Sequence, residues 1–124
     1  MLIGETFIGA NEQTFLTPWI QRQGNGVTST VEVIAISANT KVTIELLEKN
    51  SEDTGEGTPN SNPTGTNSLT SAGVTSFRNT GIQELVRYRL KVEVDVGEPL
   101  AGDVYWVHYR ILSPAWETSG AQSI

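Results

Sequence analysis

Side chains that do chemistry are sparse in this sequence, and the single histidine, His108, is the obvious place to look for catalysis. A Ser/His/Asp relay would have to use His108, yet it lies in an alternating stretch between Trp106 and Arg110, with no serine at a nucleophile elbow. The chain has no cysteine, which removes thiol nucleophiles and thiolate metal ligands. We interpret His108 as an ordinary strand residue and expect no catalytic residue and no enzyme activity.

Glu93 and Asp95 form the one pair of neighbouring carboxylates on a strand-like stretch. Glycosidases use two carboxyl groups about 5 to 10 Å apart, and this pair has a compatible spacing. The same face of the stretch begins with the cations Arg87, Arg89 and Lys91. Cross-strand charge pairs are usual on exposed sheet faces, so a solvated charge ladder explains these residues better than catalysis does.

A second acidic cluster, made of Glu52, Asp53 and Glu56, is the candidate calcium site. Calcium takes carboxylate and carbonyl oxygens, but the spacing does not match the twelve-residue loop with its central glycine and terminal glutamate. A solvated loop is the favoured interpretation of this cluster. The glycines of this region have no lysine beside them, so no phosphate-binding loop is indicated and no cofactor is expected.

Three tryptophans, Trp19, Trp106 and Trp116, are the candidate interaction residues. Together with Tyr105 and Tyr109 they have the composition of a carbohydrate platform, because aromatic rings stack on sugars. The same side chains serve equally well in a core or in a subunit contact. We prefer the core for the two tyrosines, and leave both uses open for Trp106 and Trp116.

The composition restricts the class of protein and its partners. A chain of 124 residues is about one domain, so we assign residues 1–124 to a single domain with 117–124 as an extended polar tail. A net charge of −6 with scattered basic residues argues against nucleic-acid binding. No run approaches the roughly 18 apolar residues of a membrane span, and no signal peptide is visible. We expect a cytoplasmic protein, or one released by lysis, with no membrane partner.

Strict alternation of apolar and charged residues over 86–96 predicts a long strand with one buried face. A second strand is expected over 104–112, and these two are predicted to form an antiparallel hairpin. Residues 28–36 and 41–48 are predicted to form another hairpin, and 74–77 a further strand. Segments 15–17 and 19–21 indicate a strand that Pro18 interrupts or restricts to a sheet edge.

Residues 50–73 consist almost entirely of Ser, Thr, Asn, Gly, Pro and acidic residues, so we expect a long loop that projects from the domain. No stretch has helical periodicity over three turns. About seven short strands separated by turn residues predict an all-β, single-domain antiparallel β-sandwich or jelly roll, with an open barrel as the competing architecture.

Several stretches resemble small structural proteins of tailed-phage particles, especially head decoration or cement proteins. They are residues 16–20 (LTPWI), the 33–47 segment with its SANT turn, the polar loop, and residues 106–110 (WVHYR). The resemblance implies a β-rich subunit, often trimeric, that is seated on a capsid lattice, and it carries over no functional residue.

We therefore expect a non-enzymatic structural protein of a virion, assembled in the host cytoplasm, that binds shell or capsid subunits and forms a homo-oligomer. The alternative is a carbohydrate-binding or receptor-binding β-sandwich module. An exposed strip of aromatic side chains would favour that alternative.

Overall fold

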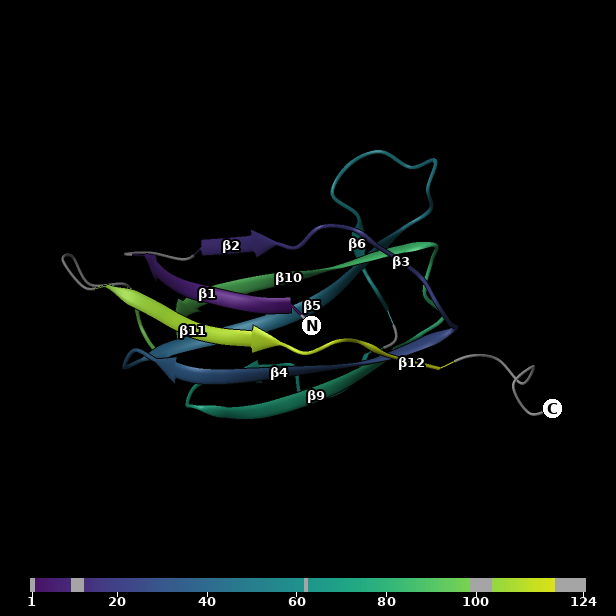
Figure 1. Cartoon of the computed structure of the whole chain (residues 1–124). Coiled ribbons are helices and arrows are strands. Elements are labelled where there is room, and N and C mark those ends of the chain that lie inside the picture. Colours follow the sequence, from purple (N-terminus) through teal and green to yellow (C-terminus); the bar gives the residue numbers. More distant parts are fainter. Residues whose placement is uncertain (1, 10–12, 62, 99–103, 118–124) are drawn as a thin grey trace.

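A computed structural model describes residues 2–9, 13–61, 63–98 and 104–117, and these form strands and connecting segments without a helix (Figure 1). The strands are β1 (Leu2–Gly9), β2 (Gln13–Leu16), β3 (Ile20–Gln21), β4 (Gly26–Ile36), β5 (Thr40–Lys49), β6 (Thr58–Pro59), β7 (Pro63–Gly65), β8 (Ser68–Leu69), β9 (Gly73–Thr80), β10 (Leu85–Val94), β11 (Tyr105–Ile111) and β12 (Ala115–Glu117). Among the described residues, none lies in a helix long and apolar enough to cross a membrane.

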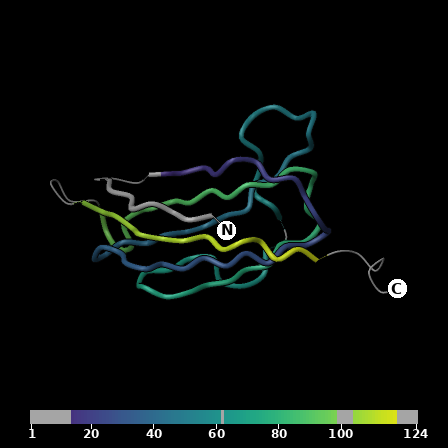
Figure 2. Tube along the Cα trace, in the orientation of Figure 1, coloured from purple at the N-terminus to yellow at the C-terminus, as the bar shows by residue number. Residues whose placement is uncertain are grey.

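Two antiparallel sheets of six strands pack face to face, which confirms the predicted β-sandwich. Sheet A has the order β1, β11, β4, β9, β7, with β12 also paired to β4. Sheet B has the order β2, β10, β5, β6, with β3 paired to β10 and β8 paired to β5. Figure 2 shows the chain passing repeatedly from one layer to the other.

The core lies between the sheets and follows directly from the alternation in the sequence. Val86, Tyr88, Leu90 and Val92 point inward from β10, while the charged residues between them stay at the surface. They pack with inward residues of β5 and β4, each fully buried aliphatic side chain contributing about 1.5 to 3 kcal/mol. The predicted strand over 86–96 ends earlier than expected, at Val94, and Val96 is 71% exposed.

One polar contact crosses this core. The hydroxyl of Tyr88 on β10 lies 2.6 Å from the hydroxyl of Ser29 on β4, and both residues are buried. Burial raises the pKa of Tyr88, and the hydrogen bond with Ser29 opposes this only in part. The contact joins the two sheets, because β4 belongs to sheet A and β10 to sheet B.

Tyr88→Phe is expected to cost about 1 to 2 kcal/mol, because it leaves the Ser29 hydroxyl buried without this partner. The stability of the variant is also expected to fall less at alkaline pH than the stability of the wild type. Since the folded-state pKa is raised, the unfolded chain loses the phenolic proton first, and wild-type stability falls as the pH rises above about 10. Urea unfolding at neutral and alkaline pH measures both effects. Equal loss of stability at alkaline pH in wild type and variant would contradict this role of Tyr88.

Both predicted hairpins are wrong. β10 pairs with β5, β2 and β3 in sheet B, whereas β11 pairs with β1 and β4 in sheet A. In the same way β4 and β5 belong to different sheets. The turn after β4 contains Asn39 with a φ of 54°, and it carries the chain across the sandwich instead of back along the same sheet. Alternation determines which face a strand buries, but the same alternation is compatible with several partners.

The predicted edge strand before and after Pro18 is confirmed. β2 and β3 pair with successive parts of β10, and Pro18 lies in the gap between them. Thr17 fills this gap, because its N–H donates to the Tyr88 carbonyl and its hydroxyl accepts from the Tyr88 N–H. The strand predicted over 74–77 is also present and extends over the whole of β9. The predicted tail after residue 117 lies outside the described residues.

The prediction that residues 50–73 project as one loop is wrong for most of this segment. Only the first part, residues 50–57, rises above the sandwich (Figures 1 and 2). Residues 58–61 and 63–69, which we call the strap, run along one side of the molecule, where β6 and β8 pair with β5, and β7 pairs with β9. The physical reason is that an uncovered strand edge offers unpaired N–H and C=O groups, and polar residues satisfy them.

Asparagines complete the strap where its short strands leave gaps. Asn67 accepts from the Ile44 N–H through its backbone carbonyl and donates to the Ile44 carbonyl through Nδ2. The Asn60 N–H donates to the Leu46 carbonyl, and the Asn60 side chain is almost fully buried. A polar segment is therefore ordered without an apolar core of its own, because its amides replace the missing strand of the ladder.

Candidate functional site

The outer face of sheet B carries most of the basic residues of an acidic chain. Register pairs Lys41 with Glu93, Thr43 with Lys91, Glu45 with Arg89, Leu47 with Arg87, and Lys49 with Leu85. Five of the eight basic residues therefore lie on this face, although the net charge of the chain is −6. The charge ladder predicted for this part of β10 is present in part: β5 places Glu45 opposite Arg89 and Lys41 opposite Glu93, whereas Arg87 and Lys91 lie opposite the uncharged Leu47 and Thr43.

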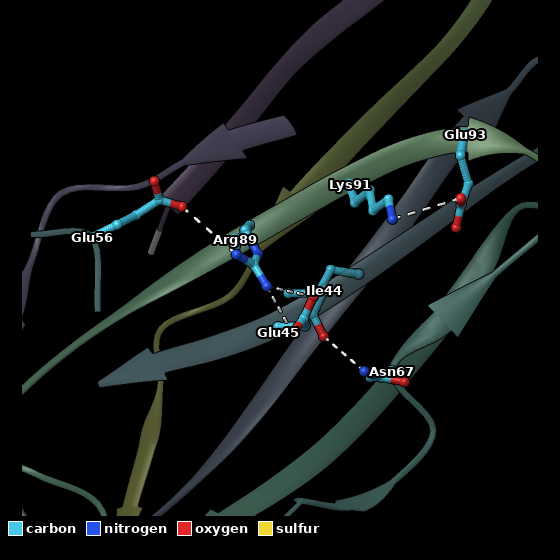
Figure 3. A network of polar contacts seen from close by, with 7 residues as sticks. All are labelled: Ile44, Glu45, Glu56, Asn67, Arg89, Lys91 and Glu93. Carbon is cyan, nitrogen blue, oxygen red and sulfur yellow. Dashed lines mark hydrogen bonds and ion pairs between the residues drawn. The ribbon is translucent and has the colours of Figure 1, made fainter. Parts of the chain in front are cut away.

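Arg89 is the centre of a network on this face, which Figure 3 shows from close by. Its Nη2 lies 3.1 Å from both carboxylate oxygens of Glu45, and its Nη1 lies 3.6 Å from Glu56 Oε1 in the projecting loop. Lys91 Nζ lies 3.8 Å from Glu93 Oε2 on the same strand. Exposed pairs of this kind contribute about 0 to 1 kcal/mol each, so the network orients the loop more than it stabilises the fold.

Trp19 covers the other half of the same face. Lys49 Nζ lies 4.6 Å and Arg87 Cζ 4.3 Å from the centre of its ring, which are cation–π distances. The loop meets the ring at Gly57, whose φ is 91° and where an added Cβ would lie 2.6 Å from the indole. Trp19, a candidate interaction residue from the sequence, therefore makes contacts within its own chain.

Leu47 is an apolar residue on the outer face of sheet B. It follows the core residue Leu46, so it points to the outer face of sheet B, yet it is fully buried. Leu47 is paired with Arg87 on one side and with Pro59 on the other. Leu47 is therefore flanked by Arg87 and Pro59, and Arg87 in turn lies against the Trp19 ring.

The structure does not join the three calcium candidates into one site. Asp53 accepts a hydrogen bond from the Asn50 N–H, and Glu56 faces Arg89. Glu52 is exposed. Over the described ranges, no group of three or more His, Asp or Glu side chains is arranged to hold a metal ion.

The other two tryptophans lie apart from Trp19. Trp116 on β12 packs against the core, whereas Trp106 on β11 points to the outer side of sheet A and is half-buried. The backbone of Trp106 is held by Ser37, whose hydroxyl accepts from the Trp106 N–H at 2.8 Å. The three rings lie on three separate elements and do not form a common strip.

His108 and the candidate carboxylate pair take ordinary places in the sheets. His108 faces outward on sheet A at the position paired with Ala35. Glu93 pairs with Lys91, while Asp95 lies beyond the end of β10, where its N–H donates to the Asn39 carbonyl. Glu93 and Asp95 therefore do not belong to one strand, because β10 ends between them.

The hollows of the surface follow the projecting loop and the strap. Two shallow, open depressions of about 530 and 510 Å³ flank the loop, the second lined by Leu16, Arg89 and Lys91 among others. A smaller pocket of about 260 Å³ lies between the strap and the sheets, against Phe77 and Asn79. Asn79 is buried, and its Oδ1 accepts no hydrogen bond from any described residue. This volume is below the 300 to 1,000 Å³ that ligand pockets usually have.

Sequence reasoning missed the buried amides of the strap, which are the most constrained polar side chains on this side of the sandwich. Asn60 and Asn79 bond to each other at 3.1 Å, and Asn60 also donates to Glu48 and to the Thr80 carbonyl. Position 79 carried a usable signal, because it continues the inward alternation of Thr75 and Phe77. Position 60 lies in a stretch without periodicity.

Comparison of the chain with protein-family models, with curated proteins and with solved structures finds no match. A function is therefore proposed from the surfaces and contacts of the chain itself.

Proposed function

We propose that this chain is a non-enzymatic structural protein of a virion, of the decoration or cement type, that stabilises a protein shell by protein–protein contacts. As such a protein, it is part of a particle assembled in the host cytoplasm, binds shell subunits, and forms a homo-oligomer. The resemblance of its sequence to decoration proteins of tailed phages gives the proposal its specific form.

The observation that carries the proposal is the strap. It covers the edges of β5 and β9 with very short strands that contain Pro59, Pro63 and Gly65. Such edges resist the addition of further strands, which would otherwise produce open-ended aggregates at high local concentration. A subunit that must occupy a lattice at fixed stoichiometry benefits from this, because strand addition is blocked on this side of the sandwich, while β1 and β2 end the sheets on the other side.

Several polar side chains hold the strap and the projecting loop in place. Asn60, Asn67 and Thr75 bind the strap to the sheets, and Arg87 and Arg89 hold the projecting loop. These contacts fix the strap and the projecting loop to the two sheets, whose outer sides are two broad faces. Broad faces suit adhesion to other protein surfaces, where affinity comes from area and a few central residues.

Purified particles of the phage whose genome encodes the chain provide the test. The protein is expected in the particles at a fixed ratio to the shell subunit, and particles from a deletion strain are expected to release DNA at a lower temperature. Adding back the purified protein should restore the wild-type temperature. Absence of the chain from purified particles, or an origin in a genome without shell genes, would contradict the proposal.

A further inference from the structure

The outer face of sheet A differs from that of sheet B in composition. Its outward positions alternate with the core residues of β4, β9 and β11. They are Thr28, Thr30, Glu32, Ile34, Val74, Ser76, Arg78, Trp106, His108 and Arg110. No lysine is among them, because all three lysines of the chain lie on the outer face of sheet B.

The charges of the described side chains of this face, on β4, β9, β11 and β12, are paired with one another. Arg110 on β11 forms an ion pair with Glu32 on β4. Arg78 on β9 bonds to Glu117 at the end of β12, with Nε 2.5 Å from Oε2, and the guanidinium lowers the pKa of the Glu117 carboxyl. Two copies of a chain with a net charge of −6 repel each other at most orientations. They approach with the least repulsion through a face whose charges are balanced.

Apolar side chains gather at one end of the same face. Val74 is 61% exposed and Ile34 is 45% exposed, and they lie diagonally across the β9–β4 pair. Ile34 is next to the irregular pairing of β4 with β11, beside His108, and Trp106 follows on the same side of β11. Interface cores are rich in Trp and Arg and poor in Lys, and this face shares these features at Trp106, Arg78 and Arg110 and in its lack of lysine, although most of its other positions are polar.

We propose that a second copy of this chain docks on the outer face of sheet A, with Ile34, Val74 and Trp106 as the apolar anchors at one end of the contact. The inference rests on the proposed function and names one surface of the homo-oligomer. Pairing the same face on both copies is isologous and gives a closed two-fold pair.

The size of the face supports this occupant. Four strands of 7 to 11 residues and the three-residue β7, about 4.8 Å apart and rising roughly 3.3 Å per residue, cover about 600 Å². A standard stable interface buries about 800 Å² on each partner, and adjoining side chains at the rim supply the remainder. The outer face of sheet B is less suitable, because the projecting loop and Trp19 already lie over it.

Val74→Glu and Ile34→Glu test the proposal, with Leu16→Glu as the matched control. Leu16 is 40% exposed and lies on the opposite side of the sandwich, at the sheet B position paired with Arg89. Sedimentation and light scattering over a wide concentration range should show a wild-type dimer. Each sheet A variant should weaken the dimer about tenfold or more, and the control should leave it unchanged. Trp106→Ala adds no charge and should also weaken it.

Circular dichroism and melting curves confirm that each variant is folded before association is compared. A wild-type chain that is monomeric at every concentration would overturn the proposal, as would a dimer that Val74→Glu and Leu16→Glu weaken equally. Both results leave the shell-binding function to its own test on particles. A dimer that only the sheet A variants weaken supports the proposal even if the particles do not contain the chain.

Discussion

Replacing Asn60 with alanine is expected to lower the free energy of unfolding by about 2 to 4 kcal/mol, a large effect for a residue in a polar segment. The side chain is 6% exposed and donates through Nδ2 to Glu48 Oε1 at 3.0 Å and to the Thr80 carbonyl at 3.1 Å. Its Oδ1 accepts from Asn79 at 3.1 Å. Alanine removes all three contacts, and each buried group left without this partner costs about 1 to 3 kcal/mol.

Chemical denaturation measures this loss, and two neighbouring positions provide controls. Asn67→Ala removes one side-chain bond, to the Ile44 carbonyl, and should cost about 1 kcal/mol. Ser61→Ala, at an exposed position of the strap, should change stability by less than about 0.5 kcal/mol. If Asn60→Ala were as mild as Ser61→Ala, the strap would be a passive covering and not a structural part of the sandwich.

A second consequence of the same substitution concerns association. Loosening the strap exposes the edge of β5 around Leu46, and an uncovered edge pairs readily with other chains. Asn60→Ala is therefore expected to aggregate on warming more readily than the Ser61→Ala control. This links the stability of the strap to the proposed role, because the strap keeps the β5 and β9 edges from pairing with other chains.

The strands and their buried faces were predictable from the sequence because alternation records burial directly. Val86, Tyr88, Leu90 and Val92 all point inward, as their spacing predicts. Pairing was not predictable in the same way. β10 and β11 both have one apolar side and are close in sequence, so a hairpin was the simplest expectation, but they belong to different sheets. Partner choice depends on packing across the sandwich, which a local pattern does not encode.

The strap was mispredicted for a different physical reason. Composition indicated that residues 50–73 had too little apolar surface to be ordered by burial. Order comes instead from hydrogen bonds to strand edges, in which Asn60 and Asn67 act as parts of a ladder. Such bonds require another segment of the chain to be in place already. A sequence shows the amide but not the edge that it meets.

The candidate surfaces were predicted in part. The row Arg87, Arg89, Lys91 was expected to form a charged outer face, and it does. Trp19 was expected only as an interaction residue, with no indication that Lys49, Arg87 and Gly57 would surround it. These contacts join β3, β5, β10 and the loop, which are remote from one another in sequence.

Trp19→Ala is expected to cost about 2 to 4 kcal/mol and to release the projecting loop. The substitution removes the ring that Lys49 and Arg87 approach and the surface against which Gly57 packs, and it frees Arg87, the cross-strand neighbour of the buried Leu47. Removing a large aromatic side chain from a core costs about 3 to 5 kcal/mol, and the value here is smaller because Trp19 is only half-buried. Chemical denaturation and the rate of proteolysis within residues 50–57 measure the two effects.

Trp106→Ala is the matched control for this prediction, because it removes the same side chain from the outer face of sheet A. Stability is compared at a concentration at which the chain is monomeric, so that association does not contribute. Trp106 has no cation–π partner among the described side chains, so its loss should cost less than half as much and leave proteolysis of the loop unchanged. Equal costs at the two positions would mean that Trp19 is an ordinary surface ring, and the buried state of Leu47 would then have to depend on Pro59 and Arg87 alone.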